Sequence, residues 1–149
     1  QCFRYDPDVT VTIMDLPGQV GMANAQIEAQ GFSSRIRFHE CNILDERQPF
    51  PKGFDAIWMS QFLDCFSDDQ IVSILKRCRE ALSADGKVYI LEPFWDRQKF
   101  RAAAFSLQQT SLYFTAMANG NSQMYHSDNF KRFIEKAGFT VSDEKDGIG

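Results

Sequence analysis

The 149-residue sequence lacks the features that mark metal-binding, nucleic-acid-binding and membrane proteins. Its four cysteines form no Cys-x-x-Cys pair, and neither histidine is at ligand spacing from them, so we predict no metal site. Lys and Arg number 16 against 20 Asp and Glu, which argues against a nucleic-acid partner. No apolar run approaches the roughly 20 residues of a membrane span, and no signal peptide is recognisable.

The residues that are present predict a single globular domain over residues 1–149. Hydrophobic residues make up 44% of the chain and aromatic residues 13%, which is enough for a substantial core. There are no repeats, low-complexity tracts or linkers. The cysteines are scattered single thiols, a usage typical of a reducing compartment, so we predict a cytoplasmic protein.

Three apolar segments typical of strands each end at a carboxylate or an amide. They are Val9–Met14 followed by Asp15, Phe54–Ser60 followed by Gln61 and Asp64, and Lys87–Leu91 followed by Glu92. In an open parallel sheet, ligands bind outside the carboxyl ends of the strands. The sequence therefore predicts that the functional residues lie at these strand ends.

Helical segments alternate with the strands. We expect one helix that follows residues 15–18 and runs through about Ala29, and another that Ser67 caps in a capping box with Gln70. The second helix carries an apolar stripe at helical spacing, made up of Ile71, Ile74, Leu75, Cys78 and Leu82. Further helices are expected from about Gln98 to Ala118 and from a Ser127 cap to Gly138, with strands at 35–40 and 139–142. This alternation predicts an α/β fold, a Rossmann-like open and mostly parallel sheet with helices on both faces. Trp58, on the central strand, is expected in the core.

Four stretches, in order, resemble class I S-adenosylmethionine-dependent methyltransferases. They are Val11–Gly18, Phe54–Gln70, Gly86–Glu92 and Lys136–Phe139. The resemblance is strongest to the small-molecule O-methyltransferase branch that includes caffeate and hydroxyindole enzymes. It implies S-adenosylmethionine as cofactor and methyl transfer to a small acceptor, most often at a hydroxyl oxygen. It also implies a homodimer.

The resemblance assigns the ribose hydroxyls of the cofactor to Asp15, with Leu16 beside it. A carboxylate at a strand end can accept two hydrogen bonds from a vicinal diol. The alternative is that Asp15 only forms the turn before Leu16, Pro17 and Gly18.

Four more residues match cofactor-binding positions of the family. Asn42 stands where the family often has an acid beside the adenine, and Ile43 could pack on the adenine face. An asparagine that caps loop backbone is the alternative reading of Asn42. Ser60 and Gln61 match the segment under the methionine portion of the cofactor.

The sequence departs from the family at the catalytic base. The family usually reads Leu-His-Asp-Trp-Ser-Asp, in which His takes the acceptor's proton, whereas residues 63–68 place Asp64 at the His position. Because an ordinary carboxylate is a weak base for a phenol, Asp64 would need burial to raise its pKa. Asp64 could instead orient the substrate or only lead into the helix. Glu92 matches a family carboxylate that steers the base.

His126 is the remaining candidate base, and an exposed loop histidine is the alternative. His39, on a predicted strand, is read as structural or exposed. In the family, the segment that corresponds to Gln98–Ala118 roofs the acceptor pocket and contributes to the dimer interface. Its aromatic residues favour an aromatic or apolar acceptor, although aromatic residues at helical spacing are also typical of a core.

A second departure concerns glycine, because none precedes Gly18. The family's Gly-rich loop, which follows its first strand, therefore has no counterpart. We expect residues 1–149 to be a partial methyltransferase domain, with the first strand, this loop and an upstream dimerisation domain absent.

Two rival functions remain open. A nicotinamide-dependent dehydrogenase also uses a strand-end acid to bind ribose, although the sequence has no Tyr-x-x-x-Lys signature. The replacement of the family's histidine by Asp64 also allows a methyltransferase-like protein that binds or dimerises without catalysis.

Overall fold

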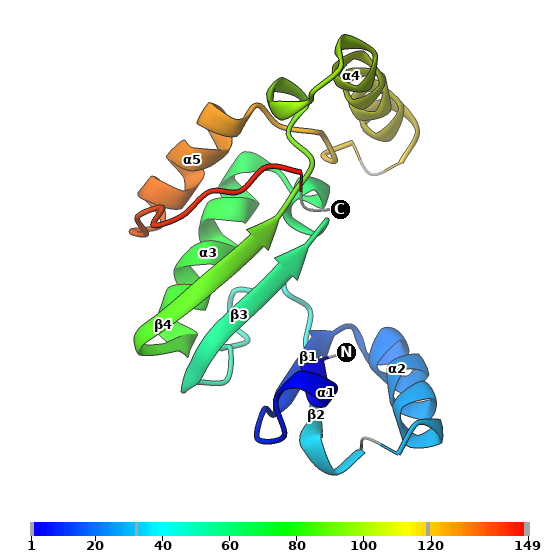
Figure 1. Cartoon of the computed structure of the whole chain (residues 1–149), viewed down its shortest axis with the longest axis vertical. Helices are drawn as coiled ribbons and strands as arrows, with labels where there is room; N and C mark the ends of the chain where they lie inside the picture. The colour runs from blue at the N-terminus through cyan, green and yellow to red at the C-terminus, as the bar shows by residue number, and fades with distance from the viewer. Residues whose placement is uncertain (1, 32, 119, 148–149) are drawn as a thin grey trace. The chain divides into compact units, whose positions relative to one another are not determined.

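The computed structural model describes residues 2–31, 33–118 and 120–147. It divides into an N-terminal unit, residues 1–48, and a C-terminal unit, residues 49–149 (Figure 1). Each unit contains a parallel pair of strands accompanied by helices. The α/β class is therefore confirmed, and the described strands form two separate parallel pairs rather than one continuous hydrogen-bonded sheet.

The N-terminal unit is built around the parallel pair of β1 and β2. Its elements are α1 (Cys2–Tyr5), β1 (Val11–Asp15), α2 (Pro17–Ala29), η1 (Ser33–Arg35) and β2 (Ile36–Glu40). The strand register runs from Val11 opposite Ile36 to Asp15 opposite Glu40. The helix α2 packs on this pair, and Val20 is its buried residue.

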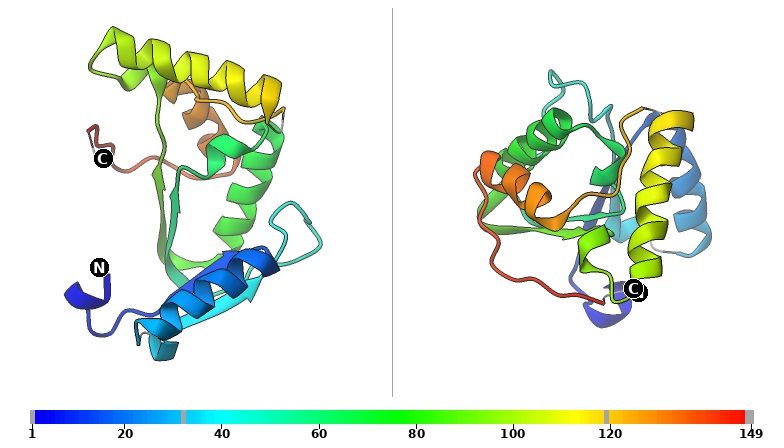
Figure 2. Two further views of the ribbon diagram at one scale, coloured as in Figure 1. Left: turned by 90° about the vertical axis from the view of Figure 1, so that its right-hand side faces the viewer. Right: turned by 90° about the horizontal axis from the view of Figure 1, so that it is seen from above.

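The C-terminal unit is built around the parallel pair of β3 and β4. Its elements are β3 (Phe54–Ser60), η2 (Leu63–Cys65), α3 (Asp68–Ala81), β4 (Leu82–Leu91), η3 (Trp95–Arg97), α4 (Arg101–Met117) and α5 (Ser127–Lys136). In both figures α3 lies along one face of the two strands, and α5 lies beside α3 (Figures 1 and 2). The bounds of β3 are those that the sequence predicts.

The core of the C-terminal unit lies around α3 and α5. The fully buried side chains with the largest volumes are Phe130, Leu63, Ile71, Ile74 and Leu75. Three of these lie on α3 at the helical spacing seen in the sequence, because residues three and four apart share a helix face. The predicted Ser67 cap and its capping box with Gln70 are confirmed. They fix where α3 begins, immediately after the loop that carries Asp64.

Trp58 is a correction to the predicted core. Its side chain is 65% exposed and stacks on Tyr89, its partner on β4, with ring centroids 6.2 Å apart. Successive strand residues point to opposite faces, so Met59 faces the core while Trp58 faces away from it. The prediction that Trp58 is in the core, which rested on the apolar residues on both faces of β3, is therefore wrong.

The strand β4 begins at Leu82, five residues before the predicted start at Lys87. Residue 54 of β3 pairs with Leu82 and residue 56 with Lys87, so the ladder is irregular across residues 83–86. Gly86 lies inside this irregularity, where the backbone passes close to Phe54. Asp85 and Gly86 therefore belong to the strand.

The C-terminal end differs from the sequence prediction in two respects. The N-cap of α5 is His126 rather than Ser127, because the His126 Nδ1 accepts the Asp128 N–H at 3.1 Å. Residues 139–142 form no strand; no neighbouring strand pairs with them in the described chain. Ion pairs hold the tail beyond them, notably Lys131 with Glu144 at 2.7 Å.

Gly86→Ala should lower the free energy of unfolding by about 1–3 kcal/mol, the usual cost of overpacking. A Cβ at this position would lie 2.9 Å from both the Phe54 carbonyl oxygen and the Leu82 Cδ2, and the backbone oxygen cannot move aside cheaply. Urea unfolding measures the effect. The matched control is Gly21→Ala in α2, where a Cβ meets nothing within 4 Å. It should be neutral or stabilising by up to about 1 kcal/mol. Equal effects of the two substitutions would contradict this packing.

Candidate active site

In the N-terminal unit, Asp15 ends β1 with an exposed side chain. Its Oδ1 accepts the Leu16 N–H at 2.8 Å, the local bond of a turn-forming aspartate. Leu16 is 51% exposed. Asp15 therefore does form the turn that the sequence allowed. Its second carboxylate oxygen, at the carboxyl end of a parallel strand, can still accept a hydrogen bond from a ligand.

Asn42 follows β2 at the same end of this strand pair. Its Oδ1 accepts the Leu44 N–H at 3.0 Å, and its own N–H donates to Gln48 Oε1 at 3.1 Å. Asn42 thus caps loop backbone, the alternative that the sequence left open. Ile43, beside it, is half-buried.

In the C-terminal unit, the chain turns sharply as it leaves β3 at Ser60. Gln61 has φ 48°, in the left-handed region that non-glycine residues rarely adopt, and its N–H donates to the Leu91 carbonyl at 2.8 Å. Such strained residues cluster at functional sites. The side chains of Ser60 and Gln61 are exposed at this strand end.

Glu92, at the end of β4, holds the loop that follows β3. Its Oε1 accepts the backbone N–H groups of Phe62 and Leu63 at 2.9 and 2.8 Å. Its Oε2 is buried and has no hydrogen-bond partner among the described residues. Glu92 therefore links the ends of the two neighbouring strands.

Burial raises the pKa of Glu92 to about 7, and the nearby Asp64 carboxyl adds to the rise, against the bonds from Phe62 and Leu63. Glu92 thus keeps a proton well above the pH at which an ordinary glutamate loses it.

Asp64 lies in η2, and its side chain is buried at 9% exposure. The pKa of Asp64 is raised because burial outweighs the opposing effect of a hydrogen bond from the neighbouring Cys65 thiol, which lies 3.5 Å from Oδ1. Asp64 and Glu92 are the sequence-predicted catalytic residues that the structure brings together. The Asp64 charge raises the pKa of Glu92 further, so the two carboxyls interact electrostatically.

His126 has a local structural part. Besides capping α5 through Nδ1, its ring packs edge-on against Trp95 with centroids 4.9 Å apart, and Nδ1 lies 3.7 Å from Asp96 Oδ2. No hydrogen bond or ion pair joins His126 to Asp64 or Glu92 within the described residues. The other histidine, His39, is half-buried on β2.

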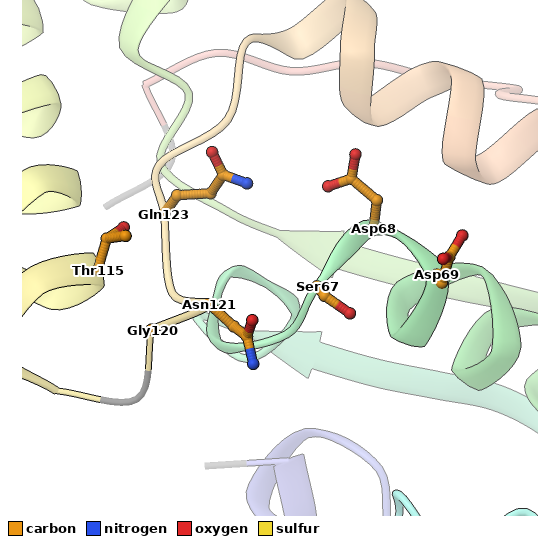
Figure 3. A pocket seen from close by; sticks show the side chains of 7 residues that line it. All are labelled: Ser67, Asp68, Asp69, Thr115, Gly120, Asn121 and Gln123. Carbon is orange, nitrogen blue, oxygen red and sulfur yellow. The ribbon is translucent and has the colours of Figure 1, made fainter.

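A polar pocket of about 300 Å³ lies beside the Asp64 loop (Figure 3). Ser67, Asp68 and Asp69 line it from the start of α3, and Asn121 and Gln123 line it from the segment between α4 and α5. Since the Gln123 N–H donates to the Asp64 carbonyl at 2.9 Å, one wall is tied directly to that loop.

Sequence reasoning missed the contacts that hold this region. The backbone N–H groups of Phe62 and Leu63 carry no side-chain signal, and Gln123 is remote from Asp64 in sequence. Across residues 2–31, 33–118 and 120–147, no group of three or more His, Cys, Asp or Glu could hold a metal ion. Within the same residues, no helix is long and apolar enough to cross a membrane.

Comparison with protein families identifies the chain. Residues 1–140 match the family of the O-methyltransferase domain, and the chain belongs to this family. Membership of this family argues against the dehydrogenase alternative.

Curated relatives show the same relationship. Scoulerine-9-O-methyltransferase 3 of Papaver somniferum is 29% identical over 133 residues, which are 89% of this chain and 34% of that protein. The 3-hydroxy-5-methyl-1-naphthoate 3-O-methyltransferase of Streptomyces sahachiroi is 32% identical over 96 residues, 64% of this chain and 27% of that protein. The chain spans about a third of the length of such relatives.

Solved structures agree with the fold. The S-adenosylmethionine-dependent methyltransferase SibL superposes with a TM-score of 0.80 at 25% identity, covering 99% of this chain and 42% of that one. The mitomycin 7-O-methyltransferase MmcR gives a TM-score of 0.80 at 19% identity, covering 95% of this chain and 39% of that one.

Glu92→Gln should change how stability depends on pH. Because the folded-state pKa of Glu92 is raised, its contribution is fully present below about pH 4.5 and is lost as pH rises through about 7. The wild type should therefore lose up to roughly 3 kcal/mol relative to Glu92→Gln between these values. Urea unfolding from pH 4.5 to 8 measures the difference, and parallel stability curves would contradict a raised pKa. Because glutamine at position 92 keeps a side-chain oxygen, it can still accept the N–H groups of Phe62 and Leu63.

Proposed function

We propose that the complete protein transfers a methyl group from S-adenosylmethionine to the hydroxyl oxygen of a small molecule, with Asp64 as general base. The observation that carries the proposal is the carboxyl pair of Asp64 and Glu92 at the ends of neighbouring parallel strands, in a chain of the O-methyltransferase domain family. Strand ends of this kind are where open α/β sheets place their chemistry.

The two carboxyls have different parts in the proposed proton transfer. We assign the proton to Glu92, whose pKa burial raises to about 7, and the role of proton acceptor to Asp64. As the acceptor's oxygen forms its bond to the methyl carbon, its hydrogen passes to an Asp64 carboxylate oxygen. Burial strengthens Asp64 as a base, because a base works best when its pKa lies near the working pH.

The chain's residues fit the cofactor at its diol. The exposed Asp15 carboxylate, fixed at a strand end by the Leu16 N–H, offers an acceptor for ribose hydroxyls. Leu16, Asn42, Ile43, Ser60 and Gln61 are the further residues that we assign to cofactor binding. When bound, S-adenosylmethionine supplies an electrophilic methyl group and leaves as a neutral thioether.

The acceptor that the surface favours is aromatic and carries a polar substituent. The exposed apolar residues of α4 and the residue before it provide apolar contact area; they are Phe100, Phe105, Leu112, Tyr113 and Met117. The polar pocket beside Asp64 provides hydrogen-bonding groups for a hydroxyl or amine. Part of the α4 surface also suits contact with a second copy in a homodimer.

A cytoplasmic location completes the proposal. Cys41, Cys65 and Cys78 are thiols rather than disulfides. Thiols of this kind persist where the compartment is reducing.

Asp15→Ala should weaken binding of S-adenosylhomocysteine at least 10-fold in the complete protein, because hydrogen bonds to a charged group contribute about 1.5–3 kcal/mol. Calorimetric titration measures the affinity. The control is Asp8→Ala, which removes an exposed carboxylate from the same unit and should leave the affinity within about twofold. Equal losses in the two variants would remove Asp15 from the cofactor site, and no binding by the wild type would refute the methyltransferase proposal.

Asp64→Asn should lower the rate of methyl transfer about 100-fold or more while leaving S-adenosylhomocysteine affinity nearly unchanged, since amides do not accept the proton. The assay uses a panel of phenols, catechols and amines with radiolabelled cofactor. Asp85→Asn, an exposed acid in β4, is the control. Cofactor binding without methylation of any panel member by the wild type would favour the non-catalytic alternative.

A further inference from the structure

Residues 122–127, which we name the strap, follow α4 and run into the first residue of α5. They contact the loop that carries Asp64 and the segment that follows Glu92. The strap is itself anchored to α4, because the Met124 N–H donates to Ser111 Oγ at 2.8 Å and the Thr115 hydroxyl donates to the Ser122 carbonyl at 3.2 Å. It lies far from Asp64 and Glu92 in sequence. Its contacts therefore constrain the site through the tertiary fold.

The first set of contacts fixes the Asp64 loop. The Gln123 N–H donates to the Asp64 carbonyl at 2.9 Å. The Tyr125 hydroxyl lies 3.0 Å from the Phe66 carbonyl oxygen and 3.1 Å from Asp68 Oδ1, and its single hydrogen is shared between these two acceptors. The backbone is thus held at Asp64 and again two residues later.

The second set of contacts fixes the segment that follows Glu92. The Trp95 N–H donates to the Tyr125 carbonyl at 3.4 Å. Asp96 accepts the Ser127 N–H at 2.8 Å and the Ser127 hydroxyl at 2.5 Å. Although burial opposes it, these bonds from Ser127 lower the pKa of Asp96, so the acceptor stays charged.

Tyr125 is the residue common to both sets, through its hydroxyl on one side and its carbonyl on the other. Its side chain is 6% exposed, and its ring packs edge-on against Phe130 and Phe133 at 5.8 and 5.4 Å between centroids. Because those rings belong to the core around α5, packing holds the Tyr125 ring, and with it the hydroxyl, in one position. Burial, together with the nearby Asp68 carboxyl, raises the pKa of the Tyr125 phenol, so it remains a donor at physiological pH.

We propose that Tyr125 is a positioning residue that clamps the Asp64 loop to the segment following Glu92 and thereby keeps the two carboxyls packed and shielded from water. The inference rests on the proposed function only for its catalytic consequence. The effect of the clamp on the surroundings of the two carboxyls can be tested without a methyl acceptor.

Several titratable groups interact with the carboxyl pair and bear on the test. Cys65 neighbours both carboxyls, and the Asp64 charge reaches Tyr125 from the loop side. On the strap side, Gln123 is uncharged, and Asp68 is the carboxyl that meets Tyr125. Loss of the clamp should admit water to the pair, which lowers raised carboxyl pKa values toward their ordinary range.

The experiment is a carbon-13 carboxyl NMR titration of the complete protein, with the Glu92 and Asp64 signals assigned from their absence in Glu92→Gln and Asp64→Asn. Tyr125→Phe removes the hydroxyl and keeps the ring. It should lower the pKa of Glu92 by about one unit. The control, Tyr113→Phe, removes the hydroxyl of an exposed tyrosine of α4 and should leave that pKa unchanged.

Ser127→Ala gives an independent variant, because it removes one bond to Asp96 while leaving the Tyr125 hydroxyl in place. It should produce a smaller change in the same direction. The proposal is overturned if Tyr125→Phe lowers the melting temperature but leaves both carboxyl pKa values at those of the wild type. Binding of S-adenosylhomocysteine to the wild type is measured separately. No binding would refute the proposed function and would leave the result on the clamp unchanged.

Discussion

The bonds from the backbone N–H groups of Phe62 and Leu63 to Glu92 Oε1 are the constraint on which the rest of the candidate site depends. They join the chain leaving β3 to the chain leaving β4. With both amides held by one carboxyl, the turn at Gln61 takes up a left-handed conformation and the next residues enter η2. Asp64 is buried as a consequence, and α3 can begin at its capping box three residues later.

The same constraint sets the chemistry. A carboxyl that accepts two N–H bonds would ordinarily be a strong acid, yet the pKa of Glu92 is raised to about 7 because burial outweighs those bonds. Below about pH 7, a protonated Glu92 spares Asp64 a neighbouring negative charge. Asp64 is then free to ionise, although burial makes it a stronger base than a surface aspartate. The pair thus offers a physical route by which a carboxylate could serve at a position where the resembling enzymes usually have histidine.

Much of the fold could be predicted because local signals and tertiary structure agree. The apolar run of β3 ends at the predicted residue, and the Ser67 cap, the Gln70 capping box and the apolar stripe all place α3 correctly. Other features depend on tertiary partners that a sequence does not display. Trp58 looks like core because its strand is apolar on both faces, yet one face is open.

The candidate site shows the same division. Strand-end position predicts that Asp64 and Glu92 lie close to one another, and the structure places them after the neighbouring strands β3 and β4. The strap was missed because its bonds use backbone groups and a tyrosine about sixty residues from the loop that it holds. His126 illustrates a different difficulty, since a histidine next to a serine is an unusual helix cap and Ser127 was the better candidate on propensity.

The proposed chemistry requires that Glu92 holds the proton while Asp64 is the ionised member of the pair. Neutron diffraction from deuterated crystals of the complete protein at about pH 6 would locate that proton directly. We expect a deuteron on the Glu92 carboxyl and none on Asp64. A deuteron on Asp64 beside an ionised Glu92 would contradict it, because the buried aspartate could not then accept a proton from an acceptor hydroxyl.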